Sequence, residues 1–140
     1  MRFVLDNSVV MRWLFGDGNQ RDLAYASHVL DALANSDAQA VVPSVWPLEV
    51  ANVVTRAEAK GLLTEARSLQ FLRLLEDLAI ATDADTAQYA LKDTLQLARR
   101  FALSAYDAAY LELALRQGLP LATLDAALHQ AASKAGVAGV

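Results

Sequence analysis

The chain has 140 residues, 55% of them hydrophobic, and we expect residues 1–140 to form a single domain with a sizeable core. It has no cysteine and only two histidines, which excludes disulfides, cysteine-based zinc sites and thiol nucleophiles, so that any metal site would need oxygen ligands. The formal net charge of -4 at pH 7 argues against a broadly basic nucleic-acid surface, so an RNA substrate would need local cationic patches or bound metal.

The first half of the chain alternates short apolar runs with amphipathic segments. The expected elements are a strand over residues 3–5, a short helix to residue 14, a turn over 16–19, a helix from residue 22, a strand over 40–42 and a helix from 44 to about 59. Ser44 is expected to cap the last of these helices, whose first turn tolerates Pro47. Gly61 is a natural stop at the other end of the same helix.

The second half continues the same alternation. The expected elements are a helix capped by Thr64, a weak strand over 79–81, a long helix opened by Asp83 or Asp85, a helix from Ser104 to near Gly118, a strand over 120–123, a last helix after Asp125 and a marginal fifth strand at Val137. This order predicts an α/β fold in which helices cover both faces of a central parallel sheet of four to five short strands.

Four carboxylates occupy positions that such a fold would bring together. Asp6 and Asp125 each follow a predicted strand, and ligands bind beyond the carboxyl ends of parallel strands. Asp107 lies in the first turn of a helix above an apolar stripe, where an unpaired charge is costly. Glu49 lies within a helix among apolar neighbours, and Arg56 is two turns away, too far for an ideal ion pair.

Each acid also has a structural explanation. Asp6 and Asp125 could simply cap helices. Asp107 could complete a capping box with Ser104, and Glu49 could be a partly exposed surface acid. Four converging carboxylates, however, would repel one another in a cleft unless one or two divalent ions neutralised them. We therefore predict a site for Mg²⁺ or Mn²⁺, which suits hydrolysis of phosphodiester bonds.

The acids stand within four short motifs. They are VLDNSV over residues 4–9, LEVAN over 48–52, YDAAYL over 106–111 and TLD over 123–125. These motifs resemble the acidic motifs of PIN domains, and most closely those of the VapC toxins of bacterial toxin–antitoxin pairs. The resemblance spans essentially the whole chain. It implies a three-layer α/β/α PIN-like domain and Mg²⁺- or Mn²⁺-dependent endoribonuclease activity.

The resemblance also assigns roles to individual residues. It places the metal site at four side chains, called here the acidic quartet: Asp6, Glu49, Asp107 and Asp125. Asp6 and Asp107 would bind metal directly, and the other two directly or through water. The matching supporting positions are Ser8, Asn52 and Thr123, although cap and turn hydroxyls also explain Ser8 and Thr123. The family further implies a homodimer and an inhibitory VapB-like antitoxin whose tail would occlude the active-site groove.

Other polar residues receive simpler interpretations. The candidates for holding RNA phosphates are Arg12, Arg56, Arg99 and Arg100. Glu112 is expected to be solvated, because five residues along a helix place it on a different face from Asp107. Asp83 and Asp85 are expected to begin a helix, and His129 to lie on the surface. The leucine-rich stretch over residues 69–78 is interpreted as core or dimer surface.

Two other functions remain open from the residues alone. A haloacid-dehalogenase-type phosphotransferase would need a second aspartate two residues after Asp6, where this chain has Ser8. A non-cleaving RNA- or protein-binding PIN module would keep the same acids without their catalytic geometry. The early carboxylate at Asp6 argues against a secretory segment, and no apolar run approaches the roughly 20 residues that span a bilayer, so a cytoplasmic location is expected. The sequence leaves the RNA target and the choice of metal undetermined.

Overall fold

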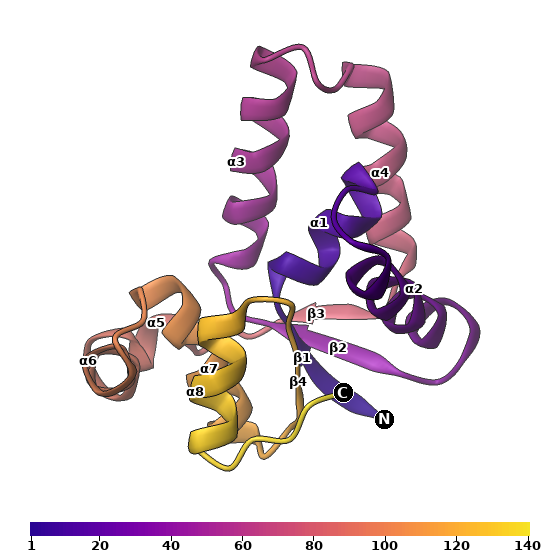
Figure 1. Ribbon diagram of the computed structural model, residues 1–140. Coiled ribbons are helices and arrows are strands. Elements are labelled where there is room, and N and C mark those ends of the chain that lie inside the picture. Colours follow the sequence, from indigo (N-terminus) through magenta and orange to yellow (C-terminus); the bar gives the residue numbers. More distant parts are fainter.

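Four short parallel strands form the centre of the fold (Figure 1). In the computed structural model, which describes residues 1–140, the strands lie in the order β3-β2-β1-β4. They are β1 (Arg2–Leu5), β2 (Gln39–Val42), β3 (Ile80–Thr82) and β4 (Leu121–Ala122). Phe3 of β1 is paired with Ala40 of β2, and Leu5 is paired with Ala122 of β4. The predicted α/β class with a parallel sheet is confirmed.

Helices lie on both sides of this sheet. They are α1 (Asn7–Phe15), α2 (Gln20–Asn35), α3 (Trp46–Ala59), α4 (Glu65–Asp77), α5 (Thr86–Tyr89), α6 (Leu95–Phe101), α7 (Ala105–Gln117) and α8 (Ala126–Lys134). Figure 1 shows α1 and α2 on one side and α7 and α8 on the other, with α3 and α4 projecting as a hairpin. The sheet is therefore the middle layer of three. No helix combines the length and the apolar character needed to cross a membrane.

The core is built around β1 and α7. The three apolar residues of β1, from Phe3 to Leu5, are completely buried, as expected for a strand in the middle of a parallel sheet. Residues 108–114 of α7 are all buried, so this helix is surrounded by protein on every side of its middle turns. A helix in that position needs apolar residues all round rather than one apolar stripe. The segment after Asp107 meets this need almost throughout.

Three helices begin at predicted caps, which are Thr64, Ser104 and Asp125. The Thr64 hydroxyl accepts a hydrogen bond from the Arg67 amide, and the Asp125 carboxylate accepts one from Leu128. The prediction for Ser44 is wrong, because α3 begins at Trp46 with no side-chain cap. The Trp46 amide bonds the Pro43 carbonyl in a turn at 3.0 Å, and this turn leaves Ser44 outside the first helical turn.

The long helix expected after Asp85 is divided into three parts. A π-helical turn, η1 (Ala90–Thr94), separates α5 from α6. A π turn inserts an extra residue and shifts the helical face that follows it. Leu91, which has helical spacing with the apolar residues Ala87 and Leu95, is consequently 85% exposed, whereas Thr94 is buried. The marginal fifth strand is likewise reduced to one bridge between Leu121 and Gly139.

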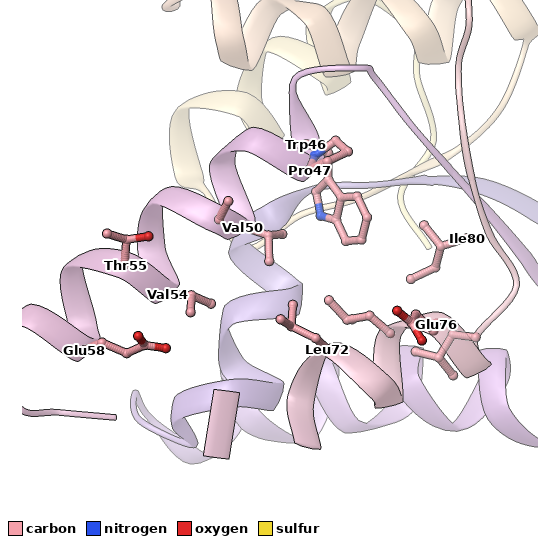
Figure 2. A pocket seen from close by; sticks show the side chains of 12 residues that line it. Trp46, Pro47, Val50, Val54, Thr55, Glu58, Leu72, Glu76 and Ile80 are labelled. Carbon is pink, nitrogen blue, oxygen red and sulfur yellow. The ribbon is translucent and has the colours of Figure 1, made fainter. Parts of the chain in front are cut away.

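An apolar groove separates α3 from α4 (Figure 2). It encloses about 640 Å³, and Val50, Val54 and Leu72 line its walls. The leucine-rich stretch predicted as core or dimer surface divides between these two roles. Leu75 and Leu78 are buried, while Leu69 and Leu72 are exposed.

Candidate functional site

Asp6 is the most buried member of the quartet. It follows β1 directly and is 4% exposed. Its Oδ2 accepts hydrogen bonds from the Ser8 hydroxyl at 2.6 Å and from the Thr123 hydroxyl at 2.8 Å. Because β1 and β4 are paired neighbours, the residues that follow the two strands meet at one edge of the sheet. Two of the three predicted supporting residues therefore contact Asp6.

Both hydroxyls are oriented by backbone amides. The Leu124 amide donates to the Ser8 Oγ at 2.9 Å, and the Asp125 amide donates to the Thr123 Oγ1 at 3.0 Å. Each hydroxyl oxygen is thus occupied as an acceptor, which leaves its own proton for the Asp6 carboxylate. This arrangement fixes Asp6 Oδ2 within a network of four hydrogen bonds, two of which join the segment after β1 to the segment after β4.

Glu49 is held by a residue that the sequence did not single out. The Tyr110 hydroxyl donates to Glu49 Oε1 at 2.6 Å, and Tyr110 is completely buried. Burial and the neighbouring Glu49 charge raise the pKa of Tyr110, so its hydroxyl remains protonated and acts as a donor. Tyr110 lies three residues after Asp107, on the same side of α7, and this spacing is the signal that could have identified it.

The four acids affect one another electrostatically. Burial raises the pKa of Asp6, and the Asp125 charge raises it further, although the Ser8 and Thr123 hydroxyls oppose the shift. Burial also raises the pKa of Asp107, with added repulsion from Asp6 and Asp125. For Glu49, burial raises the pKa first, and the charges of Asp6 and Asp107 add to it. The four acids thus lie in one region of the structure, near enough for their charges to interact.

The donor set fits a hard divalent cation. All four side chains offer carboxylate oxygens, which Mg²⁺ and Mn²⁺ prefer, and no basic side chain contributes to the pKa of Asp6, Glu49 or Asp107. As the side chains stand, no three acids or histidines are close enough to hold one ion. A bound ion would therefore have to draw the carboxylates inward.

One carboxylate oxygen remains free on Glu49 and on Asp125. The protein donors reach only Oε1 of Glu49 and Oδ2 of Asp125, whereas Asp6 is also bonded by the backbone of Ser8. The other oxygen of Glu49 and of Asp125 has no hydrogen-bond partner within the chain. Donors that hold one oxygen and leave the second available are typical of the surroundings of a metal ligand.

Asn52 is not connected to the quartet. It is exposed on α3, three residues after Glu49, and its side chain makes no hydrogen bond. The structure therefore gives a contact for Ser8 and Thr123 but none for Asn52.

The metal-free protein should become less stable as the pH rises from about 4.5 to 7. The pKa values of Asp6, Glu49 and Asp107 are raised in the folded state, so the folded protein binds more protons than the unfolded chain over this interval. Their stabilising contribution is present below the ordinary carboxyl values and is lost as the pH rises through the raised ones. Urea unfolding in EDTA at several pH values measures the slope.

Asp6→Asn is the matched variant for this pH series, and its slope should be shallower than that of the wild-type chain. An equal slope would show that Asp6 titrates normally. Asp83 has a lowered pKa, because the Arg116 and Thr86 hydrogen bonds outweigh burial, and it acts in the opposite direction. Its contribution is complete above about pH 4, outside the measured interval.

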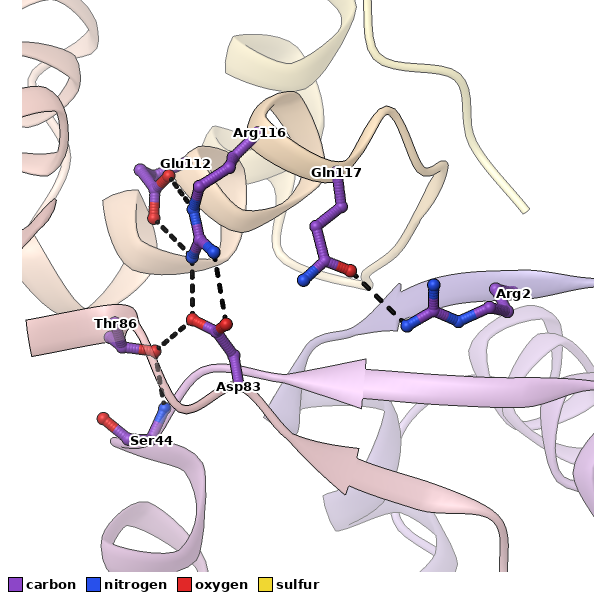
Figure 3. Close-up of polar contacts among 7 residues, drawn as sticks. All are labelled: Arg2, Ser44, Asp83, Thr86, Glu112, Arg116 and Gln117. Atoms are coloured by element: carbon purple, nitrogen blue, oxygen red, sulfur yellow. Dashed lines mark hydrogen bonds and ion pairs between the residues drawn. The ribbon is translucent and has the colours of Figure 1, made fainter. Parts of the chain in front are cut away.

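A second group of buried charges lies away from the quartet (Figure 3). Arg116 pairs with Glu112 at 2.7 Å and with Asp83 at 2.7 Å, and Asp83 also accepts the Thr86 hydroxyl at 2.8 Å. We call Asp83, Glu112 and Arg116 the buried ion triad. The expectation that Glu112 is solvated is wrong, since it is 3% exposed. The physical reason is that α7 is enclosed on the face that carries Glu112 as well as on the face that carries Asp107.

The predicted phosphate-binding arginines differ in their surroundings. Arg12 forms an ion pair with Asp17 at 2.8 Å, and Arg100 lies over the Phe101 ring at 5.0 Å. Arg56 and Arg99 are exposed and form no ion pair. Asp85 precedes α5 as predicted, but its side chain makes no capping bond.

Comparisons with known proteins agree on one family. A family model described as the PIN domain matches residues 3–134. Ribonuclease VapC3 from Pyrobaculum aerophilum is 36% identical over 82 residues, which cover 59% of this chain and only 63% of that protein. The crystal structure of PAE2754 from Pyrobaculum aerophilum has a TM-score of 0.64 at 18% identity, covering 94% of this chain and 84% of the other. The crystal structure of FitAcB from Neisseria gonorrhoeae has a TM-score of 0.56 at 20% identity, covering 99% of this chain and 96% of the other.

Proposed function

The chain belongs to the PIN-domain family, and on this basis we propose that it is a metal-dependent endoribonuclease that acts as the toxin of a toxin–antitoxin pair. The observation that carries the proposal is the acidic quartet, in which burial and neighbouring acids raise the pKa of Asp6, Glu49 and Asp107 without a neutralising basic side chain. The similarity to a protein named Ribonuclease VapC3 supports RNA as the substrate.

In this proposal, Asp6 and Asp107 hold Mg²⁺ or Mn²⁺ directly, and Glu49 and Asp125 bind directly or through water. When bound, the ion would activate water and neutralise charge at the scissile phosphate. Ser8 and Thr123 keep Asp6 in one orientation through its Oδ2. Tyr110 does the same for Glu49 through Oε1, and the Leu128 amide does so for Asp125. These hydrogen bonds limit the orientations that each acid can adopt when the ion draws the carboxylates inward.

We also propose a VapB-like antitoxin as partner, a homodimer as the assembled form and a cytoplasmic location. The antitoxin is supported by the VapC name of the relative and by the fold shared with FitAcB. The exposed leucines of α4 offer apolar surface for an assembly. In the inhibited state, the antitoxin's tail would cover the acidic quartet.

The purified chain, free of antitoxin, should cleave RNA in the presence of Mg²⁺ or Mn²⁺, and EDTA should stop this cleavage. The test is incubation with total bacterial RNA under the three conditions, followed by mapping of the fragment ends. Restored cleavage on adding metal back after EDTA would confirm that the ion acts reversibly. Metal-dependent RNA binding without cleavage by folded protein would contradict the nuclease and favour a non-cleaving module. Cleavage that persists in EDTA would contradict the metal site.

A further inference from the structure

A polar cavity of about 480 Å³ opens beside the acidic quartet. One wall is formed by Thr123, Leu124 and Asp125, which follow β4. Thr123 donates to Asp6 at 2.8 Å, so a single side chain separates the cavity from the most buried acid of the site. Whatever occupies the cavity therefore lies next to the phosphate that the quartet would bind.

An aromatic side chain from α2 also lines the cavity. Tyr25 is half-buried and packs against the hydrophobic core, so its ring is held by its surroundings. Its hydroxyl lies beside the backbone of Thr123, which links α2 to the segment after β4. A fixed aromatic face beside a phosphate site is suited to stacking a nucleic-acid base.

The rim supplies groups that suit a neighbouring phosphate. Arg21 and His129 both line the cavity and are exposed. Arg21 takes part in none of the ion pairs of the chain, whereas Arg12 and Arg116 are already paired. Asp22 also lines the cavity, and its carboxylate makes the cavity unsuitable for a second phosphate deep inside. The interior thus favours a base and ribose, and the rim favours the backbone.

We propose that this cavity binds the nucleoside next to the scissile phosphate of a single-stranded RNA, with Tyr25 stacking on the base and Arg21 contacting the adjoining phosphate. The proposal rests on the nuclease function proposed above and adds a substrate subsite to it. The cavity volume of about 480 Å³ agrees with a nucleoside as occupant, because pockets of several hundred Å³ hold small ligands.

The test measures binding of a short, fluorescently labelled single-stranded RNA by anisotropy, with Asp107→Asn present in every protein so that the RNA stays intact. Tyr25→Leu should weaken binding about tenfold through lost stacking, whereas Tyr25→Phe should stay within about twofold. Arg21→Ala should reduce the slope of log affinity against log salt concentration by about 0.7, the value for one lost phosphate contact on a single strand. Arg73→Ala removes an equally exposed arginine on α4, outside the cavity, and should leave the slope unchanged.

The same substitutions without Asp107→Asn should raise KM for RNA cleavage more than they lower kcat, because the subsite binds substrate and transition state alike. Thermal melts identify any variant that fails to fold. If Tyr25→Leu fails to fold, Arg21→Ala still tests the proposal, because Arg21 is exposed. If Tyr25→Leu and Arg21→Ala both keep the RNA affinity and the KM of the wild-type chain and still cleave RNA, the subsite is overturned. The proposed nuclease function would be unaffected by that result. Absence of both cleavage and RNA binding in the wild-type chain would overturn both.

Discussion

Replacing Arg116 with methionine should lower the free energy of unfolding by about 3–5 kcal/mol, because it leaves two buried carboxylates without a counter-charge. Asp83 and Glu112 are both almost completely buried, and Arg116 is the only basic group that contacts them. In a protein of this size the loss corresponds to a fall of about 10–15 °C in Tm. Thermal melts and urea unfolding at pH 7 measure it.

The triple variant Asp83→Asn, Glu112→Gln, Arg116→Met removes the charges together and should recover most of this loss. Breaking a buried ion pair is costly mainly because one charge is left behind, whereas neutral groups of similar shape are tolerated. Arg73→Met, on the exposed face of α4, is the matched control and should change stability by less than about 0.5 kcal/mol. A Tm for Arg116→Met equal to that of this control would show that the triad is solvated in solution.

Asp107→Asn should reduce RNA cleavage at least about 1000-fold, equivalent to about 4 kcal/mol of transition-state stabilisation. The amide keeps the size of the side chain but removes the negative charge that would bind the ion. Because burial, with added repulsion from Asp6 and Asp125, raises the pKa of Asp107, losing this charge should leave Tm unchanged or higher in the absence of metal. Initial cleavage rates and the Mn²⁺-induced shift in Tm are measured side by side.

Asp77→Asn provides the control, since Asp77 is exposed at the end of α4. Its rate should equal that of the wild-type chain. The double variant Asp6→Asn, Asp107→Asn should be no worse than either single variant, because groups that hold one ion act as a unit. Equal cleavage by Asp107→Asn and wild type would point to a contaminating nuclease or to a different catalytic centre.

Much of this architecture could be predicted from local sequence signals. Residues 3–5 form a strand because a continuous apolar run is what a fully buried parallel strand requires, and Asp6 ends it where the chain reaches the edge of the sheet. Thr64, Ser104 and Asp125 begin helices because each offers an oxygen to an otherwise unpaired amide. The placement of Asp6 and Asp125 at one edge of the sheet followed from the same logic, since they come after the adjacent parallel strands β1 and β4.

The remaining features depend on contacts between distant segments. Tyr110 and Glu49 are 61 residues apart, so the spacing of Tyr110 from Asp107 could place Tyr110 near the site but could not identify Glu49 as its partner. Glu112 and Arg116 have the spacing of an ordinary surface pair, so only the burial of α7 and the arrival of Asp83 from β3 reveal the triad. The π turn at Ala90–Thr94 also lacks a local signal, because its apolar spacing matches that of a continuous helix.

The length of helix α7 sets the spacing and relative rotation of the two charged regions of the protein. Asp107 at its first turn faces the quartet, and Arg116 at its last turn reaches Asp83 beyond β3. Removing or adding one residue between them would rotate one end by 100° relative to the other, so both ends could not keep their partners. Changes in chain length are therefore forbidden within this segment, whereas the turn at Gly16–Asn19 has no such restriction. Over evolutionary time, insertions and deletions should accumulate in loops such as that turn and spare the nine-residue interval from Asp107 to Arg116.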